Sequence, residues 1–352
     1  MVIDISERSL ACLVLAGEDE GRAWYREFID KVVSEVFYGD TFIKWENKAV
    51  LPALGPNTIG PSNLDIILSE LRACPYISPD FVLPIGPEVK LQEALSGDQR
   101  LVIPQGDNIT DNFFKGVEAL DEMGYEGKYF AIIPGDSPLP RAENYKNAID
   151  SWKWRCNPDT EVYCGLVRKD KVVQIIEKEG LQRFGTARTE IPFFARLKRR
   201  NLHKYGVRYR DYDAMCGVGE KPVLIYSNFL IFNRDALRRP DARERFSHLY
   251  DFKRVVMKIW NWPKYIREFG PSNIYSFVTG KMATQELERM LDEREKVKVK
   301  LFLADPIFAL DIDNKPDWLR AAQYIADHRR EYAYFKDPLG KSEILRESDN
   351  KS

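Results

Sequence analysis

The sequence has little of what several common classes of protein require. Its 352 residues include 53 Lys and Arg against 54 Asp and Glu, a net charge of −1, so it lacks the basic excess typical of a nucleic-acid-binding surface. No run of about 18 consecutive apolar residues occurs, and we therefore expect no membrane-spanning helix. The opening MVIDISERSL has no basic region followed by an apolar run, so no secretory signal is expected.

Cysteine and histidine are scarce and scattered. The five cysteines are odd in number and lack C-x-x-C spacing, which indicates reduced thiols and favours a cytoplasmic location. The three histidines, His203, His248 and His328, form no H-E-x-x-H or similar cluster. Histidine-based hydrolysis is therefore disfavoured, and we expect any chemistry to use carboxylates, amides, lysines and arginines.

Short apolar runs alternate with helical patterns along the first half of the chain. In Asn63–Arg72, for example, leucines and isoleucine recur at the spacing of one helical face. This alternation predicts an α/β protein whose mainly parallel sheet is covered by helices on both faces. Strands are expected at Leu10–Leu15, Ala49–Leu54, Phe81–Ile85, Leu101–Pro104, Tyr129–Pro134, Glu161–Val167, Val223–Phe232 and Val297–Leu303. Helices are expected at Trp24–Phe37, Asn63–Arg72, Glu88–Leu95, Asp111–Met123, Lys253–Phe277 and Pro316–His328.

The junctions after the strands matter most, because ligands of such sheets bind beyond the carboxyl ends of the strands. LAGEDEGR, from Leu15 to Arg22, follows the first strand. Its backbone at Ala16 and Gly17 could approach phosphate, although the segment could equally be a solvated acidic loop. Lys48 precedes the next apolar run and is either a phosphate ligand or an ordinary surface lysine.

Two further junctions carry amide and carboxylate groups. Gln105, Gly106 and Asn112 could read a planar base, while the alternative is an ordinary turn with Thr110 as a helix N-cap. Asp136 follows a fully apolar strand in YFAIIPGDSPL and is placed to bind Mg²⁺, or else it caps the helix expected near Pro140.

Later in the chain, Asn228 lies inside an apolar strand, where its amide needs a dedicated partner. Asp311 and Asp313 lie on one side of an extended segment, because alternate residues of a strand face the same way. This spacing is compatible with two interpretations, a metal site or an exposed edge followed by a capped helix. The sequence does not distinguish between them.

Together these segments resemble the MobA-like NTP transferases and the related sugar-phosphate nucleotidyltransferases. LAGEDEGR is similar to the family's L-A-G-G-x-x-x-R, and KAVLPALG to its K-A-L-L-P-x-x-G. VIPQGDNITDN resembles the base-reading segment, IPGDSPL the metal aspartate segment, SNFLIFN a late metal-sharing asparagine, and DIDNKPDW the end of the fold. All of these motifs occur in the family's order, over residues 10–140 and 222–328.

The resemblance implies a Rossmann-like three-layer α/β/α protein of the nucleotide-diphospho-sugar transferase fold. It implies one domain over residues 1–332, with a nucleotide-binding half at 1–140 and an acceptor-binding half at 141–332. Within that second half we expect an insertion at 152–221 and a helical segment at 253–291. Residues 333–352 are expected to be a polar tail.

The implied activity is a Mg²⁺-dependent nucleotidyl transfer from an NTP to a phosphorylated small molecule, with release of pyrophosphate. Arg22 and Lys48 would offset charge, and Leu15, Ala16, Gly17, Gln105, Gly106 and Asn112 would bind the nucleotide. Asp136, Asn228 and Asp313 would hold the metal. The base, the acceptor and a possible homodimer are left undecided.

Two rivals remain. A glycosyltransferase of the same fold would use an NDP-sugar, although its D-x-D motif would lie unusually late here. A non-catalytic nucleotide binder is suggested by Glu18, which replaces the family's second glycine, and by the inserted residues 23–47. The basic, aromatic segment Lys253–Gly280 could touch a membrane or a lipid-like acceptor, or could be a helix facing the core or a dimer partner.

Overall fold

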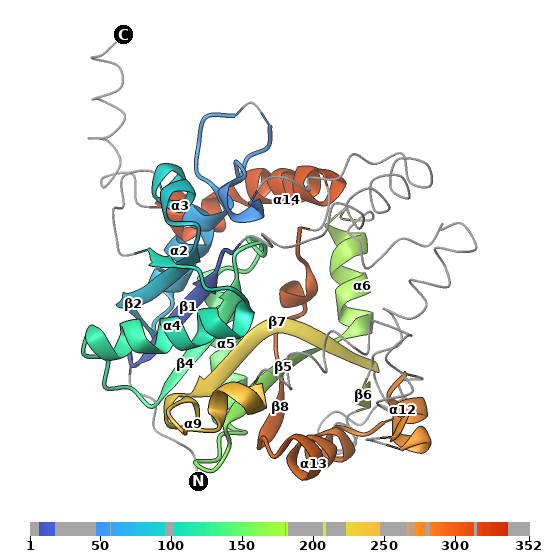
Figure 1. Cartoon of the computed structure of the whole chain (residues 1–352). Coiled ribbons are helices and arrows are strands. Elements are labelled where there is room, and N and C mark those ends of the chain that lie inside the picture. Colours follow the sequence, from blue (N-terminus) through green and yellow to red (C-terminus); the bar gives the residue numbers. More distant parts are fainter. Residues whose placement is uncertain are drawn as a thin grey trace, which may run out of the picture.

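A single sheet with helices on both faces forms the computed structural model (Figure 1). The structure describes residues 7–17, 47–56, 58–95, 102–179, 181, 207–208, 223–246, 266–267, 270–278, 282–312 and 315–336. Its strands are β1 (Leu10–Leu15), β2 (Ile77–Gly86), β3 (Ile103–Pro104), β4 (Tyr129–Pro134), β5 (Val162–Arg168), β6 (Val207–Arg208), β7 (Val223–Asn233) and β8 (Val299–Leu303).

The order of the strands across the sheet is β3-β2-β1-β4-β7-β5-β8, with β6 paired to β7. Among these described strands β7 runs antiparallel to its neighbours, while the pairs β1–β2, β1–β4, β2–β3 and β5–β8 are parallel. The expected α/β class with a mixed, mainly parallel sheet is therefore confirmed.

Helices connect the strands and cover both faces of the sheet. They are α2 (Asn63–Ala73), α3 (Glu88–Ala94), α4 (Ile109–Glu122), α5 (Ala142–Lys153), α6 (Lys169–Lys178), α9 (Arg234–Leu237), α12 (Pro271–Val278), α13 (Thr284–Glu295), α14 (Lys315–Asp327) and α15 (Ala333–Lys336). Short 3-10 helices occur at η1 (Lys48–Val50), η3 (Pro306–Ala309) and η4 (Arg329–Glu331).

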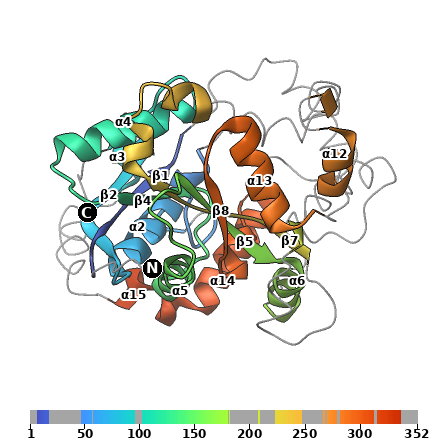
Figure 2. The same ribbon diagram turned by 90° about the horizontal axis from the view of Figure 1, so that it is seen from below.

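Strand β1 shows how the sequence builds two apolar layers. Leu10, Cys12 and Val14 pack into a core with α2, α5, α6 and α14, whereas Ala11 and Leu13 pack on the other face with α4, α9 and α13. Figure 2 shows α4 and α13 on one side of the sheet and α2, α5 and α14 on the other. Alternate residues of the strand point to opposite faces of the sheet. Both faces of β1 are buried because helices cover each of them.

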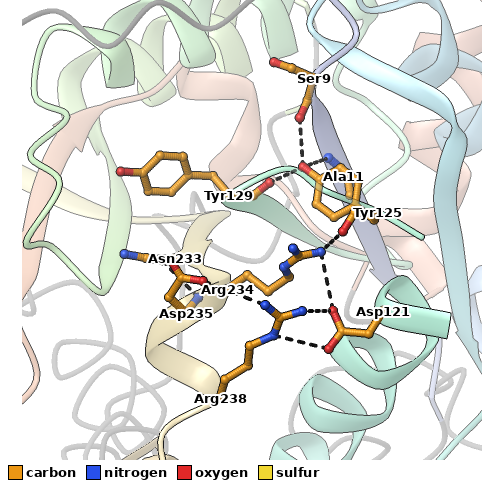
Figure 3. A network of polar contacts seen from close by, with 9 residues as sticks. All are labelled: Ser9, Ala11, Asp121, Tyr125, Tyr129, Asn233, Arg234, Asp235 and Arg238. Carbon is orange, nitrogen blue, oxygen red and sulfur yellow. Dashed lines mark hydrogen bonds and ion pairs between the residues drawn. The ribbon is translucent and has the colours of Figure 1, made fainter. Parts of the chain in front are cut away.

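A polar network closes the amino ends of β1 and β4 (Figure 3). The buried hydroxyl of Tyr125 accepts a hydrogen bond from the backbone N–H of Ala11 at 2.9 Å and lies 2.8 Å from the carbonyl oxygen of Ser9. The Arg234 guanidinium binds the Tyr125 carbonyl and pairs with Asp121 at 3.4 Å. This network lies at the amino ends of β1 and β4. It therefore stabilises the fold at the edge of the sheet opposite to the carboxyl ends, where the sequence predicts the ligand site.

Several predicted elements differ from the structure. The strand expected at Ala49–Leu54 is wrong: the chain forms η1 there, because the side chain of Asn47 accepts a hydrogen bond from the Ala49 N–H and starts a helical turn. Ala49, Leu51 and Ala53 are nevertheless buried, which explains the strand-like alternation of the sequence.

Other expected segments fall partly or wholly outside the described residues. The helix at Trp24–Phe37 lies outside them, as does most of Lys253–Phe277, of which α12 forms the end. Strand β5 lies within the expected insertion 152–221 and is a strand of the main sheet between β7 and β8. Residues 333–336, expected in the polar tail, form α15 against α2. None of the described helices is long and apolar enough to cross a membrane.

Candidate functional site

The carboxyl ends of β1, β2, β3 and β4 meet at one edge of the sheet. Leu15 at the end of β1 pairs with Ile85 of β2 and with Pro134 of β4, and Gly86 of β2 pairs with Pro104 of β3. The loops that follow these strands therefore begin side by side. They carry Gly17, Gln105 and Asp136, which were predicted from the sequence to be site residues.

The turn after β1 is held by neighbouring backbone and one amide side chain. The Ala16 N–H donates to the carbonyl oxygen of Ile85 at 2.8 Å, and Asn47 Nδ2 donates to the Ala16 carbonyl at 2.5 Å. Gly86 is required beside this turn, because a Cβ there would lie 2.6 Å from the Ala16 oxygen. The first loop is thus packed tightly between β2 and the segment that carries Lys48.

The amide groups after β3 lie against the same turn. A Cβ on Gly17 would be 3.2 Å from Gln105 Oε1 and 3.5 Å from Asn112 Nδ2. The Gly106 N–H donates to Asn112 Oδ1 at 2.6 Å, which fixes the orientation of that amide and turns its N–H donors toward Gly17. The structure therefore brings Gly17, Gln105, Gly106 and Asn112 together.

Helix α4 begins differently from the expected N-cap. Asn108, and not Thr110, is the N-cap residue, because its side chain accepts a hydrogen bond from the Asp111 N–H at 3.0 Å. The early start places Asn112 in the first turn of the helix, from which its side chain reaches back to Gly106. Thr110 is buried.

Lys48 and Asp136 form an ion pair at this edge. Lys48 Nζ lies 3.3 Å from Asp136 Oδ2, and each side chain is 28% exposed. Asn63 Nδ2 holds the Lys48 backbone by donating to its carbonyl oxygen at 2.9 Å, and the N–H of Gly135 donates to the Leu15 carbonyl at 2.7 Å. The pair places one positive and one negative charge beside the Gly17 turn, within reach of solvent.

Asp136 does not cap the following helix. The residue at the N-cap of α5 is Arg141, whose backbone N–H binds Asn144 Oδ1 at 2.8 Å. Asp136 is instead next to the late segment of the chain, because its carbonyl oxygen accepts a hydrogen bond from the Ile312 N–H at 3.0 Å. This contact brings the backbone of Asp311 and Ile312 alongside the aspartate.

The expected metal ligands are only partly described. Asp313 and Arg22 lie outside the described residues, as does Glu18. Asn228 is half-buried in β7, two residues before Leu230, which pairs with Ile132 of β4. Within the described ranges no group of three or more Asp, Glu, His or Cys forms a metal site.

The chemistry of the available donors nevertheless suits a hard cation. The Asp136 carboxylate, the Asn228 amide on the neighbouring strand β7 and the carboxylate of Asp311, next to the Ile312 that contacts Asp136, carry oxygen atoms of the kind that Mg²⁺ prefers. Among the described residues, the buried hydroxyl of Ser137, the next residue in the chain, has no hydrogen-bond partner. The residues at this edge fit a Mg²⁺ ion.

Several residues that shape the site were not predicted from the sequence. Asn47 and Asn63 hold the turns through side-chain contacts to Ala16 and Lys48. Trp318 and Tyr332 bind the carbonyl oxygens of Pro52 and Leu139, in the loops that carry Lys48 and Asp136. The two aromatic contacts join segments far apart in sequence, so no local pattern predicts them.

Comparison with known proteins identifies the fold. No protein-family model matches the chain, and no curated protein matches it in sequence. A hypothetical transferase from Thermus thermophilus superposes with a TM-score of 0.54 at 16% identity, covering 88% of this chain and 99% of that one.

Two named enzymes superpose less well. A CMP-2-keto-3-deoxy-manno-octonic acid synthetase complexed with CTP gives a TM-score of 0.47 at 9% identity, covering 91% of this chain and 99% of the other. A 4-diphosphocytidyl-2C-methyl-D-erythritol synthase from Anaerococcus prevotii gives 0.42 at 11% identity, with the same coverage. These two similarities are too weak to establish a shared fold. The chain is therefore similar in fold to the Thermus thermophilus transferase, with a mixed, mainly parallel sheet between two layers of helices.

Proposed function

We propose that the protein is a Mg²⁺-dependent nucleotidyltransferase that joins an NTP to a phosphorylated small molecule and releases pyrophosphate. The observation that carries the proposal is the convergence of four separate segments at one edge of the sheet. They supply a glycine turn, two amides, and the Lys48–Asp136 pair. The Thermus thermophilus protein of similar fold is described as a transferase, which agrees with this chemistry.

The triphosphate is assigned to the Gly17 turn and Lys48. Backbone amides at a turn after a strand can approach phosphate closely when no side chain intervenes, and a glycine provides that space. The Lys48 ammonium offsets the charge that builds up on the leaving pyrophosphate. Arg22 is assigned the same task, on the resemblance alone.

The base is assigned to the amides beside the same turn. Asn112 presents N–H donors toward Gly17, because its oxygen is bound by the Gly106 N–H. These donors suit a carbonyl oxygen or a ring nitrogen of the base. Gln105 lies next to them and gives a second amide for recognition.

The reaction needs no histidine base. An oxygen of the acceptor phosphate attacks the α-phosphorus, a new P–O bond forms, and the bond from the α-phosphorus to the departing pyrophosphate breaks. A phosphate dianion is already a nucleophile, so the protein contributes position and charge. Asp136, with Asn228 and Asp313, would hold Mg²⁺, which supplies charge neutralisation at the phosphate oxygens when bound.

A pyrophosphate-release assay tests the proposal. The wild-type protein is incubated with Mg²⁺, each of the four NTPs and a panel of sugar and polyol phosphates. Asp136→Asn should lower turnover by about 100-fold or more, because the neutral amide would bind Mg²⁺ more weakly and the charge on the phosphate oxygens would be neutralised less. Asp159→Asn is the matched control, since Asp159 is exposed in the turn before β5 at the opposite edge of the sheet.

The outcomes separate the proposal from its rivals. Pyrophosphate release that is lost in Asp136→Asn and kept in Asp159→Asn supports nucleotidyl transfer. Unchanged turnover in Asp136→Asn would refute the assignment of Asp136. Release of an NDP from an NDP-sugar, without pyrophosphate, would identify a glycosyltransferase, and binding without any product would identify a non-catalytic nucleotide binder.

A further inference from the structure

The end of the described chain returns to the candidate site and contacts two of its loops. We call residues 47–56 the Lys48 loop and residues 135–141 the Asp136 loop. The C-terminal segment, residues 310–312 and 315–336, comprises α14, η4 and α15 with Leu310–Ile312 before them. Figure 1 shows α14 beside the end of the sheet, and Figure 2 shows α15 near α2 and α5.

Trp318 anchors the Lys48 loop. Its indole N–H donates to the carbonyl oxygen of Pro52 at 2.8 Å, and its ring is almost fully buried. Gly55 in the same loop has φ +102°, which an L side chain rarely adopts, and it lies against Ala322 of α14. This hydrogen bond and the contact of Gly55 with Ala322 hold the Lys48 loop against α14.

Tyr332 anchors the Asp136 loop. Its hydroxyl is completely buried and donates to the carbonyl oxygen of Leu139 at 2.9 Å. Beside it, Glu331 forms an ion pair with Arg141, the residue that ends the loop. At the start of the C-terminal segment, the Ile312 N–H holds the carbonyl oxygen of Asp136 at 3.0 Å. One continuous piece of chain therefore binds the loops of both charged residues.

We propose that the C-terminal segment positions the Lys48–Asp136 pair, with Trp318 and Tyr332 as its positioning residues. Neither side chain is assigned a contact with substrate. Trp318 holds the Lys48 loop and Tyr332 holds the Asp136 loop. The two charged groups, Lys48 Nζ and Asp136 Oδ2, lie 3.3 Å apart. The inference rests on the proposed function only for its kinetic consequence; the ordering of the two loops is testable without any substrate.

Two conservative variants remove the hydrogen bonds while keeping an aromatic ring. Trp318→Phe deletes the indole N–H, and Tyr332→Phe deletes only the hydroxyl. The chain offers a matched control for each: Trp152 and Tyr145 are fully buried, and their Nε1 and hydroxyl have no hydrogen-bond partner among the described residues. Trp152→Phe and Tyr145→Phe therefore make the same chemical changes without breaking such a bond.

Hydrogen exchange of the full-length protein gives the first readout. Trp318→Phe should speed amide exchange in residues 47–56, and Tyr332→Phe should speed it in residues 135–141, whereas the control variants leave both loops as in the wild type. Exchange at wild-type rates in both loops of both variants would overturn the proposal. This result is independent of whether an NTP is turned over.

Steady-state kinetics gives the second readout. Each variant should lower kcat by about tenfold with little change in KM for the NTP, because misplaced groups impair the chemical step more than ground-state binding. A variant with a loosened loop and unchanged kcat would overturn the positioning role. If the wild type turns over no NTP, the proposed function fails, while the exchange experiment still decides whether the segment orders the loops.

Discussion

A single hydrogen bond from a backbone N–H sets the orientation of the Asn112 side-chain amide. An amide side chain can present either its oxygen or its nitrogen to a ligand, so the sequence leaves its hydrogen-bonding polarity open. In the structure the Gly106 N–H occupies Asn112 Oδ1 at 2.6 Å, and the nitrogen faces Gly17. The polarity of this amide therefore follows from a neighbour six positions earlier that no local pattern identifies.

Tyr125 offers a test of the fold at the same scale. Burial raises the pKa of its hydroxyl to about 12, so the group stays protonated and can donate to a carbonyl while accepting the Ala11 N–H. Tyr125→Phe should lower the free energy of unfolding by about 1–3 kcal/mol, because the buried Ala11 N–H loses its acceptor. Denaturant unfolding measures the change.

Tyr145→Phe provides the comparison for Tyr125→Phe. The Tyr145 hydroxyl is buried without a hydrogen-bond partner in the part of the chain that the structure describes, so its removal should change stability by less than about 0.5 kcal/mol or increase it. Equal losses in the two variants would mean that the hydrogen bond of Tyr125 does not matter and that both changes act through packing.

At the scale of elements, burial decides which predictions succeed. Leu10–Leu15 and Tyr129–Pro134 were predicted as strands with the bounds that the structure has, because each is a continuous apolar run buried on both faces. Ala49–Leu54 has similar alternation, but its start belongs to the 3-10 helix Lys48–Val50 under the Asn47 cap and the rest is a turn. A buried alternating segment is therefore not always a strand, and the side chain before it decides the local geometry.

Glu70 joins three elements through one carboxylate. It is buried on α2, and its oxygens accept hydrogen bonds from the N–H of Ala142 at the start of α5 and of Ala333 at the start of α15. Burial raises the pKa of Glu70, and the hydrogen bonds from these amides lower it by less. The folded state therefore holds its proton more tightly than the unfolded state.

This raised pKa predicts the sign of a pH effect. The stability that the protonated carboxyl contributes is present at low pH and is lost as the pH rises from the ordinary value of 4.5 through the raised value. The free energy of unfolding of the wild type should accordingly fall relative to that of Glu70→Gln between pH 4.5 and pH 7, because glutamine does not titrate. Urea unfolding across this range measures the difference, and a relative increase for the wild type would contradict the account.

At the scale of the whole molecule, the site is formed by segments that lie far apart in the sequence. The resemblance motifs predicted Gly17, Lys48, Gln105, Asn112 and Asp136, and the parallel strands place them at one edge. The supports of that edge were not predicted, because Trp318 and Pro52 are separated by 266 residues and no periodic pattern connects them. Local patterns identify strands and turns, whereas contacts across the fold depend on how the layers pack.

The proposed function requires that this edge of the sheet binds a nucleoside triphosphate with Mg²⁺. Thermal unfolding with ATP, GTP, CTP and UTP in turn, each with and without Mg²⁺, tests this requirement. A ligand at about 100 times its Kd stabilises a protein by about 2.7 kcal/mol. We predict a Mg²⁺-dependent rise in Tm with at least one nucleotide, lost in Asp136→Asn and kept in Asp159→Asn; no rise with any of the four, or a rise that Asp136→Asn retains, would contradict the account.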